Sequence, residues 1–297
     1  MKKKLLTIVL AIVISLSIVL LKNNFSQLLP NKQFGITGLK DNQTIDNLFI
    51  GSSMFKQGID PNCISDNDYI VAYNGNEPTN IYEELMYLLS RNIEIKNLYI
   101  DMYAWTIIRG PWIDDIKILW DTDIRTINNI FNSFNEPSLI YTYEYYISSN
   151  NDFLLSYPIS TNILNNYYLK GGNNYNSAHA SKEYLDSLDL NASGYNEISP
   201  DEAQIEAIIN IKELCTKNSI NLCFIETPKY YREMNWDNYK IVMEQYEKIL
   251  TNNNIKYILS KEIDFDNEDN KNFSDLLHMS SIGCKEYTSK LVKLLGQ

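Results

Sequence analysis

Histidine is scarce in this chain of 297 residues, with only two copies, and cysteine (4), proline (8) and glycine (11) are also few. A zinc site is not expected, because no two cysteines form a C-x-x-C pair and two histidines add little. Neither a metal nor another cofactor is therefore predicted. Positively charged residues are also fewer than negatively charged ones: 26 Lys and Arg against 37 Asp and Glu give a net charge of -11. Binding to nucleic acid needs clustered Lys and Arg, so that class is excluded.

A long apolar run occurs only at the N-terminus, in "MKKKLLTIVLAIVISLSIVLLKNN". Three lysines precede the run Leu5–Leu21, which spans roughly 25 Å as a helix, the short end of a membrane span. The basic flank predicts a cytoplasmic N-terminus and an exported remainder. A cleaved signal peptide, and hence a secreted protein, opens in the same way, but no small-x-small cleavage site follows. We expect residues 1–22 to form a single-pass anchor in the cell membrane.

The cysteines are expected to be free and mostly buried. Cys215 and Cys223 flank a helix-to-strand junction and could form a disulfide outside the membrane, whereas Cys63 and Cys284 show no pairing pattern. The sequence leaves both states open.

After a polar linker at residues 23–46, apolar strand-like runs alternate with amphipathic helical segments. The expected strands are 47–50, 69–73, a third ending near 101–105, 221–228 and 255–260; the expected helices are 81–92, 201–220, 239–254 and 283–296. Ser199 and Pro200 are expected to begin the second of these helices. Such alternation predicts a parallel sheet with helices on both faces, a three-layer α/β/α sandwich over residues 47–297.

One segment, at about residues 106–198, breaks this alternation and is rich in Asn, Tyr and Trp. We interpret it as a mostly helical insertion at the carboxyl edge of the third strand, where open α/β sheets bind ligands. A subdomain without any role in substrate binding is the alternative.

Ser53 stands where the first strand ends, in "NLFIGSSMF". A serine hydroxyl is a weak nucleophile and needs a base, usually an oriented histidine. His179 lies in the insertion, whereas His278 follows the last strand, with Asp275 three residues earlier in "FSDLLHMSSIGCKEY". Positions i and i+3 face the same way on a helical turn, so Asp275 can orient His278. The alternatives are a serine that caps the next helix and a structural histidine.

"FIGSSM" after the first strand, together with "DLLHMSSIG" before the last helix, resembles the SGNH or GDSL-type hydrolase superfamily. The resemblance covers residues 47–297 in element order and implies a flavodoxin-like sheet. By position, it implies that Ser53 is the nucleophile, His278 the base and Asp275 the orienting acid, with Ser52 in the slot usually held by Asp.

The Gly-Ser-Ser sequence, the anchor and the insertion are similar to one branch of that superfamily. This branch contains membrane-anchored surface-polysaccharide O-acyltransferases, such as the teichoic-acid D-alanine transfer protein and the alginate acetyltransferases. The resemblance implies an acyl donor and a surface polysaccharide as partners, and a multi-spanning membrane acyl exporter beside the protein.

The resemblance also implies an oxyanion hole made of the Ser53 amide, a glycine after the second strand and an asparagine after the third. Gly75 occupies the glycine position, and Asn74 or Asn76 could add a side-chain amide. "DMYAW" follows the third strand without the usual Asn. Losing one such donor costs about 10²–10³ in rate, so a replacement would be needed.

Other residues near the strand ends are open to two interpretations. Asp101 and Glu226 end strands at the same edge, where they could line the pocket or form structural hydrogen bonds. Tyr103 and Trp105 could stack on sugar rings or belong to the core of the helical subdomain.

The sequence therefore predicts an extracytoplasmic O-acyl esterase or acyltransferase that acts on a cell-surface polysaccharide through an acyl-serine. The alternative is an inactive SGNH-like protein that binds glycan or serves as a scaffold in an export complex.

Overall fold

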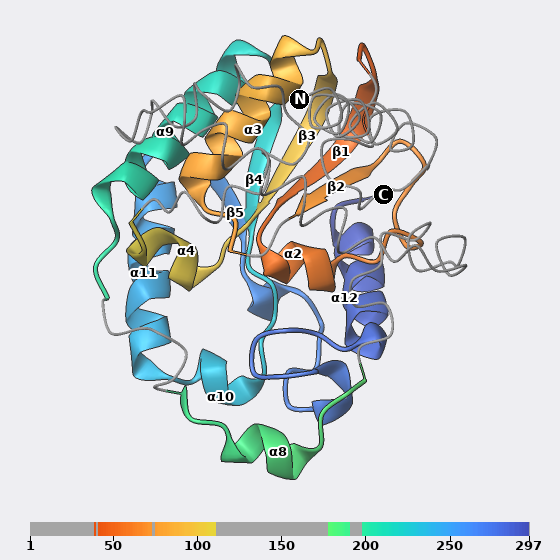
Figure 1. Cartoon of the computed structure of the whole chain (residues 1–297), viewed down its shortest axis with the longest axis vertical. Coiled ribbons are helices and arrows are strands. Elements are labelled where there is room, and N and C mark those ends of the chain that lie inside the picture. The colour runs from red at the N-terminus through yellow and green to blue at the C-terminus, as the bar shows by residue number, and fades with distance from the viewer. Residues whose placement is uncertain (1–38, 40, 73–74, 111–177, 191–197, 297) are drawn as a thin grey trace, which may run out of the picture.

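The described part of the chain is built around one five-stranded parallel sheet (Figure 1). The computed structural model describes residues 39, 41–72, 75–110, 178–190 and 198–296. The strands lie in the order β2-β1-β3-β4-β5, with bounds β1 Thr44–Gly51, β2 Tyr69–Ala72, β3 Glu94–Asp101, β4 Asn221–Ile225 and β5 Lys256–Ile258. In this flavodoxin-like order, ligands bind where the strand order reverses, between β1 and β3. The predicted α/β class with a parallel sheet is confirmed.

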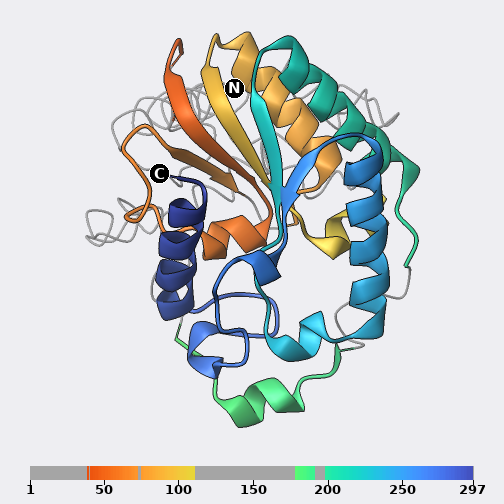
Figure 2. The same cartoon turned by 180° about the vertical axis from the view of Figure 1, so that it is seen from behind.

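Helices cover both faces of the sheet, as the two opposite views show (Figures 1 and 2). One face carries α3 (Pro78–Ser90), α9 (Glu202–Lys217) and α11 (Asp237–Asn252). The other face carries α2 (Ser53–Gly58) and α12 (Ser281–Leu294). The arrangement is the three-layer sandwich expected from the sequence.

Strand β1 shows why an unbroken apolar run is needed at the centre of such a sheet. Leu48, Phe49 and Ile50 are all fully buried. Leu48 and Ile50 pack with α3, α9 and α11, whereas Phe49 packs with α2 and α12. Successive side chains of a strand point to opposite faces, so a strand covered on both sides must be apolar at every position.

The shorter elements are α4, α8, α10 and two 3₁₀ helices, η6 and η7. Their bounds are α4 Ala104–Ile108, α8 Lys182–Ser187, α10 Tyr231–Met234, η6 Ser260–Glu262 and η7 Asn270–Asn272. Most of the insertion predicted at 106–198, and all of the anchor predicted at 1–22, lie outside the described residues. Within the described residues, no helix is long and apolar enough to cross a membrane.

Element boundaries differ from the predicted ones by a few residues. Strand β1 begins at Thr44, so it includes the last residues of the predicted linker. Helix α9 begins one residue later than expected, and its cap is Asp201, whose carboxylate accepts hydrogen bonds from the amides of Ala203 and Gln204. The prediction that Ser199 and Pro200 begin this helix is therefore wrong, because a carboxylate at Asp201 satisfies two free amides of the first turn.

The amino edge of the sheet is tied together by a row of amides. Asn221 donates to Asn97 (3.0 Å), Asn97 donates to Asn47 (2.9 Å) and Asn47 donates to Asp68 (2.7 Å). The three asparagines are register partners on β4, β3 and β1. A slip of one residue would move them to opposite faces, so the row helps to fix the register.

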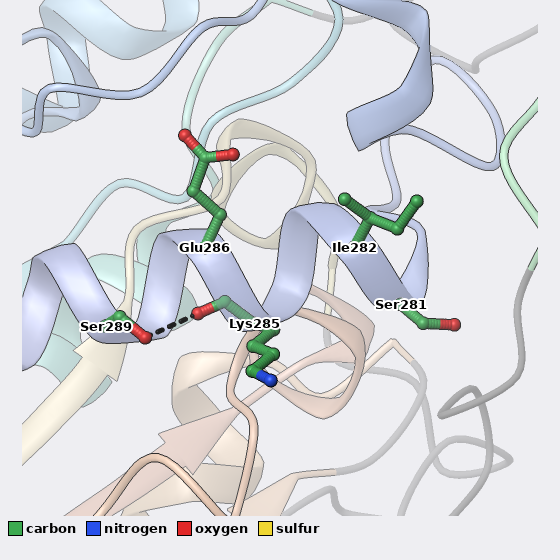
Figure 3. A pocket seen from close by; sticks show the side chains of 5 residues that line it. All are labelled: Ser281, Ile282, Lys285, Glu286 and Ser289. Carbon is green, nitrogen blue, oxygen red and sulfur yellow. Dashed lines mark hydrogen bonds between the residues drawn. The ribbon is translucent and has the colours of Figure 1, made fainter.

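Helix α12 packs unusually closely against the chain before it. A Cβ atom at Gly283 would lie 2.1 Å from the carbonyl oxygen of Asn272 at the end of η7. Another side of α12 faces solvent: Ile282 is 54% exposed and borders a surface pocket (Figure 3). That pocket is lined by Ser281, Ile282, Lys285, Glu286 and Ser289.

We predict that Gly283→Ala lowers the free energy of unfolding by about 1–3 kcal/mol, because the added methyl group must displace backbone rather than a flexible side chain. The helix propensity of alanine acts in the opposite direction by roughly 0.5–1 kcal/mol. Ile282→Ala on the exposed face is the matched control and should change the unfolding free energy little. Urea denaturation of the three proteins measures the difference, and equal stability of Gly283→Ala and wild type would show that α12 does not pack as described.

Candidate active site

Ser53 stands at the carboxyl edge of the sheet, where β1 passes directly into α2. Gly51 ends the strand, Ser52 caps the helix and Ser53 is the first helical residue. The Ser52 hydroxyl accepts a hydrogen bond from the amide of Met54 (3.2 Å). This short strand-to-helix turn leaves the Ser53 side chain partly exposed at the edge, while Ser52 is fully buried.

The loop before α12 brings Asp275 and His278 together. One carboxylate oxygen of Asp275 accepts the backbone amides of Leu277 and His278, each at 2.7 Å. Ser274 donates its amide to the carbonyl of His278 (2.9 Å), and Phe273 pairs with Met279 in an isolated β-bridge. These bonds close the loop on itself and hold the Asp275 and His278 side chains on the same side.

Ser53, His278 and Asp275 form a continuous line of hydrogen bonds. His278 Nδ1 lies 2.8 Å from Asp275 Oδ2, and His278 Nε2 lies 2.9 Å from Ser53 Oγ. An ionised carboxylate can only accept, so Nδ1 carries the proton and Nε2 is left to accept from the serine hydroxyl. The structure thus brings together the three residues singled out in the sequence, from opposite ends of the chain. His179, the other histidine, is exposed on the residues before α8.

The surroundings of Asp275 favour its ionised form. Burial is the largest influence and acts to raise its pKa. The hydrogen bond and charge of His278, together with the two backbone amides, outweigh burial, so the pKa of Asp275 is lowered. A carboxylate that stays charged can stabilise a positive charge on the neighbouring imidazole.

A second carboxylate, Asp101 at the end of β3, holds the residue next to the nucleophile position. Asp101 is 2% exposed; its Oδ1 accepts the Ser52 amide (3.0 Å) and its Oδ2 accepts the Ser52 hydroxyl in a short hydrogen bond. Burial raises the pKa of Asp101 to about 6, against the opposing effects of the Ser52 hydrogen bonds and the charge of Lys229. The sequence places Asp101 at the right edge, but it gives no sign of its pairing with Ser52.

The residues predicted for an oxyanion hole meet different outcomes. The amide of Ser53 lies in the first turn of α2. The capping hydroxyl of Ser52 accepts the amide of Met54 and not that of Ser53, so the Ser53 N–H takes no part in the cap. Gly75 follows β2 with a φ of 68°, a left-handed conformation that favours glycine. Asn76, however, is buried and donates its side-chain amide to both oxygens of Glu84 (3.2 and 3.0 Å). Its predicted role as an oxyanion donor is not supported by this placement, because the amide is bonded to the buried Glu84 side chain. Asn74 lies outside the described residues.

The two aromatic residues predicted to bind substrate differ in exposure. Tyr103 is 6% exposed, and the Lys229 ammonium lies 5.3 Å from its ring centre. Its ring is part of the protein interior and offers little surface for a sugar. Trp105 is half-buried, stacks with Tyr103 at 6.5 Å and carries the Arg109 guanidinium 4.5 Å from its ring. A role for Trp105 in substrate binding stays a prediction.

Glu226, the other carboxylate predicted at this edge, forms hydrogen bonds with neighbouring side chains and backbone. It accepts hydrogen bonds from the amide and hydroxyl of Ser260 (2.9 and 2.8 Å) and from the hydroxyl of Tyr239 (2.5 Å). The fully buried Lys229 donates to Tyr239 (3.1 Å) and to the carbonyl of Thr227 (3.0 Å). Of the two interpretations open for Glu226, structural hydrogen bonding is the one that fits.

All four cysteines are free thiols, with Cys215, Cys223 and Cys284 buried and Cys63 half-buried. A disulfide between Cys215 and Cys223, one of the two states that the sequence leaves open, is absent from the structure.

Among the residues that the structure describes, no group of three or more His, Cys, Asp or Glu side chains is arranged to hold a metal ion.

The buried Glu84 makes stability depend on pH. Burial raises its pKa from 4.5 to about 8, with the Asn76 hydrogen bond acting the other way. Between these values the folded chain keeps a proton that the unfolded chain has lost. The contribution of Glu84 to stability is therefore greatest below about pH 4.5 and is lost as the pH rises to about 8.

We predict that Glu84→Gln removes this loss, since an amide stays neutral at every pH. The difference in unfolding free energy between the variant and wild type should grow by as much as roughly 1.4 kcal/mol per pH unit between about pH 5 and 8. Urea denaturation at several pH values measures it, with Glu213→Gln on the exposed face of α9 as the control. If both variants follow wild type in parallel across this range, Glu84 is not protonated in the folded chain.

No protein-family model matches the chain, and no curated protein matches it. Solved structures to which the chain is similar include a GDSL-like lipase from Bacteroides thetaiotaomicron, with 10% identity, a TM-score of 0.37 and coverage of 88% of this chain and 94% of that one. A protein described as an acylhydrolase from Bacteroides fragilis has 11% identity and a TM-score of 0.37, with coverage of 87% of this chain and 88% of that one. A protein described as a platelet activating factor from Streptococcus pneumonia has 11% identity and a TM-score of 0.39, with coverage of 96% of this chain and 99% of that one.

Proposed function

We propose that this protein is a serine acyl-transfer enzyme that works through an acyl-Ser53 intermediate. The observation that carries the proposal is the line of hydrogen bonds from Ser53 Oγ through the His278 imidazole to Asp275. Each member has the partner that its chemical role needs. The hydroxyl faces a nitrogen that can accept its proton, and the other ring nitrogen faces an ionised carboxylate.

In the acylation step, Ser53 Oγ attacks the carbonyl carbon of an acyl ester or thioester, and His278 Nε2 takes the hydroxyl proton. Asp275 stabilises the imidazolium that forms. The tetrahedral intermediate then collapses: the bond to the leaving group breaks, and His278 returns its proton to that group. The acyl group remains on Ser53 as an ester.

In the second step, His278 takes a proton from the acceptor, whose oxygen attacks the acyl-Ser53 carbonyl. The tetrahedral intermediate collapses, the bond between the acyl carbon and Ser53 Oγ breaks, and His278 returns the proton to Ser53 Oγ. Water as the acceptor gives an esterase, and a sugar hydroxyl gives an O-acyltransferase. Both reactions use the same three residues. The choice therefore depends on whether the site binds a sugar and excludes water, and not on the triad.

The developing oxyanion is bound by the backbone amides of Ser53 and Gly75 in this proposal. The side chain of Asn76 does not add a third donor, since it is held by Glu84. A site with two donors instead of three gives up about 10²–10³ in rate.

The location and the acceptor form the finer part of the proposal. We infer that the domain is held outside the cytoplasm by residues 1–22 and transfers acyl groups to or from a surface polysaccharide, beside a membrane acyl exporter that supplies the donor. The support is the basic and apolar N-terminal sequence and the aromatic-rich segment after β3. The resemblance of the two motifs to surface O-acyltransferases points the same way.

We predict that a fluorophosphonate probe labels Ser53 in the full chain, because a serine activated by a histidine reacts with such esters. Intact mass followed by peptide mapping locates the adduct. Ser53→Ala should abolish the label, and His278→Ala should slow it by at least about 10³-fold. Ser289→Ala, on the outer face of α12, is the control and should label like wild type. A folded wild-type chain without any adduct would contradict the proposal and favour an inactive glycan-binding or scaffold protein.

The acceptor is tested in cells that produce the protein. Replacing the chain with Ser53→Ala should remove the ester-linked acyl groups that a surface polysaccharide carries, measured as acid released by mild base. Ser289→Ala should leave them unchanged. Wild-type levels of acylation in the Ser53→Ala cells would exclude a surface transferase, and increased acylation would identify an esterase.

A further inference from the structure

Asp101 reaches across from β3 to the turn that presents Ser53, although it contacts neither Ser53 nor His278 in any hydrogen bond of the described chain. Its two oxygens take both donors of Ser52: the amide at 3.0 Å and the hydroxyl in a short hydrogen bond. Ser52 is fully buried and directly precedes Ser53. Two bonds from one carboxylate to one residue fix both its position and its rotation.

We propose that Asp101 is a positioning residue for the nucleophile: by holding the amide and the hydroxyl of Ser52, it sets the turn from which Ser53 reaches His278. This inference rests on the proposed function, since it assigns Asp101 a part in acylation of Ser53.

The turn is built around this carboxylate. A Cβ atom at Gly51 would lie 2.0 Å from Asp101 Oδ1, so the carboxylate fills the space of the missing side chain. Ile50 and Ile100 are register partners on β1 and β3, which places Gly51 and Asp101 side by side at the ends of the two strands. A carboxylate can reach Ser52 in this way only because position 51 is glycine.

The hydrogen bonds of Ser52 also decide which serine reacts. Its hydroxyl donates its proton to Asp101 and accepts the Met54 amide (3.2 Å), so both of its functions are occupied. The neighbouring Ser53 hydroxyl is left to His278, and the Ser53 amide is not needed for the helix cap. Asp101 thereby separates the two serines into one that supports the turn and one that reacts.

Asp101 interacts electrostatically with four other ionisable groups of the described chain. They are Glu84 on α3, Lys229 after β4, Tyr246 on α11 and Tyr287 on α12. Lys229 supplies the positive charge among them, and it favours the ionised form of Asp101 that accepts two hydrogen bonds.

Glu226 provides a matched control for this arrangement. It directly follows the neighbouring strand β4 and is 6% exposed. Like Asp101, it accepts hydrogen bonds from both the amide and the hydroxyl of one serine, here Ser260. Ser260 lies in η6 and not beside the nucleophile. Loss of Glu226 therefore disturbs a buried carboxylate–serine pair of the same kind without disturbing the turn at Ser53.

The experiment measures two quantities for Asp101→Asn, Ser52→Ala, the double variant and Glu226→Gln. These are the rate constant for fluorophosphonate labelling of Ser53 and the free energy of unfolding. We expect Asp101→Asn and Ser52→Ala each to slow labelling by about 10- to 100-fold, as small displacements of a reacting group do. The double variant should be no slower than the slower single variant, since both remove the same interaction. Glu226→Gln should lose stability and keep the wild-type labelling rate.

A rescue variant separates positioning from general damage. In Ser52→Asp with Asp101→Ser the carboxylate and the hydroxyl exchange positions, and this double variant should label at least tenfold faster than Asp101→Ser alone. If instead Asp101→Asn and Ser52→Ala label like wild type, or slow only as much as Glu226→Gln, Asp101 has no positioning role. A wild-type chain that is not labelled would overturn the proposed function and this inference together. A labelled wild type with an equally labelled Asp101→Asn would overturn the inference alone.

Discussion

The turn from β1 into α2 depends on a close approach of the Asp101 side chain to the backbone of residue 51, which only glycine permits. At Gly51 the carboxylate of Asp101 occupies the place of a side chain, because a Cβ atom there would lie 2.0 Å from its nearer oxygen. From that place it reaches both donors of Ser52, and Ser52 in turn begins α2. The position of Ser53 at the edge of the sheet follows from this contact.

The other half of the site depends on a second close approach of the same kind. Gly283 lets α12 pack against the carbonyl of Asn272, and the amide of Ser280 donates to that same carbonyl (2.9 Å). The loop between these two points carries Asp275 and His278. Two glycines, one near each end of the chain, therefore let backbone and side chains come close enough for a hydrogen bond of 2.9 Å between His278 and Ser53. Such precision is what a nucleophile and its base require.

The sequence predicts the parts of this site that are local and misses those that depend on register. The strand-helix alternation gave the sheet and its layers, because buried parallel strands are apolar throughout. Ser53 and the Asp275–His278 pair are recognisable from a strand end and an i, i+3 spacing. Asp101 ends β3, whereas Ser52 follows the end of β1, so their pairing could be found only from the alignment of the two strands. The hydrogen bond between Asn76 and Glu84 escapes prediction for a related reason: Glu84 lies in the next helix, and the sequence does not show that the two side chains meet.

Buried polar groups lie at both edges of the sheet and are paired in different ways. At the amino edge, β1, β3 and β4 carry three asparagines whose amides form a row that ends at the buried carboxylate of Asp68. At the carboxyl edge, the same strands lead into Ser52, Asp101 and Glu226, with Lys229 close behind. Burying ionisable groups costs free energy unless each is paired. Asp101 and Glu226 are each paired with a serine, but only the partner of Asp101, Ser52, directly precedes Ser53. Of the two buried carboxylates, Asp101 is therefore the one whose hydrogen bonds would support the proposed acyl-transfer step, which requires a preorganised polar site.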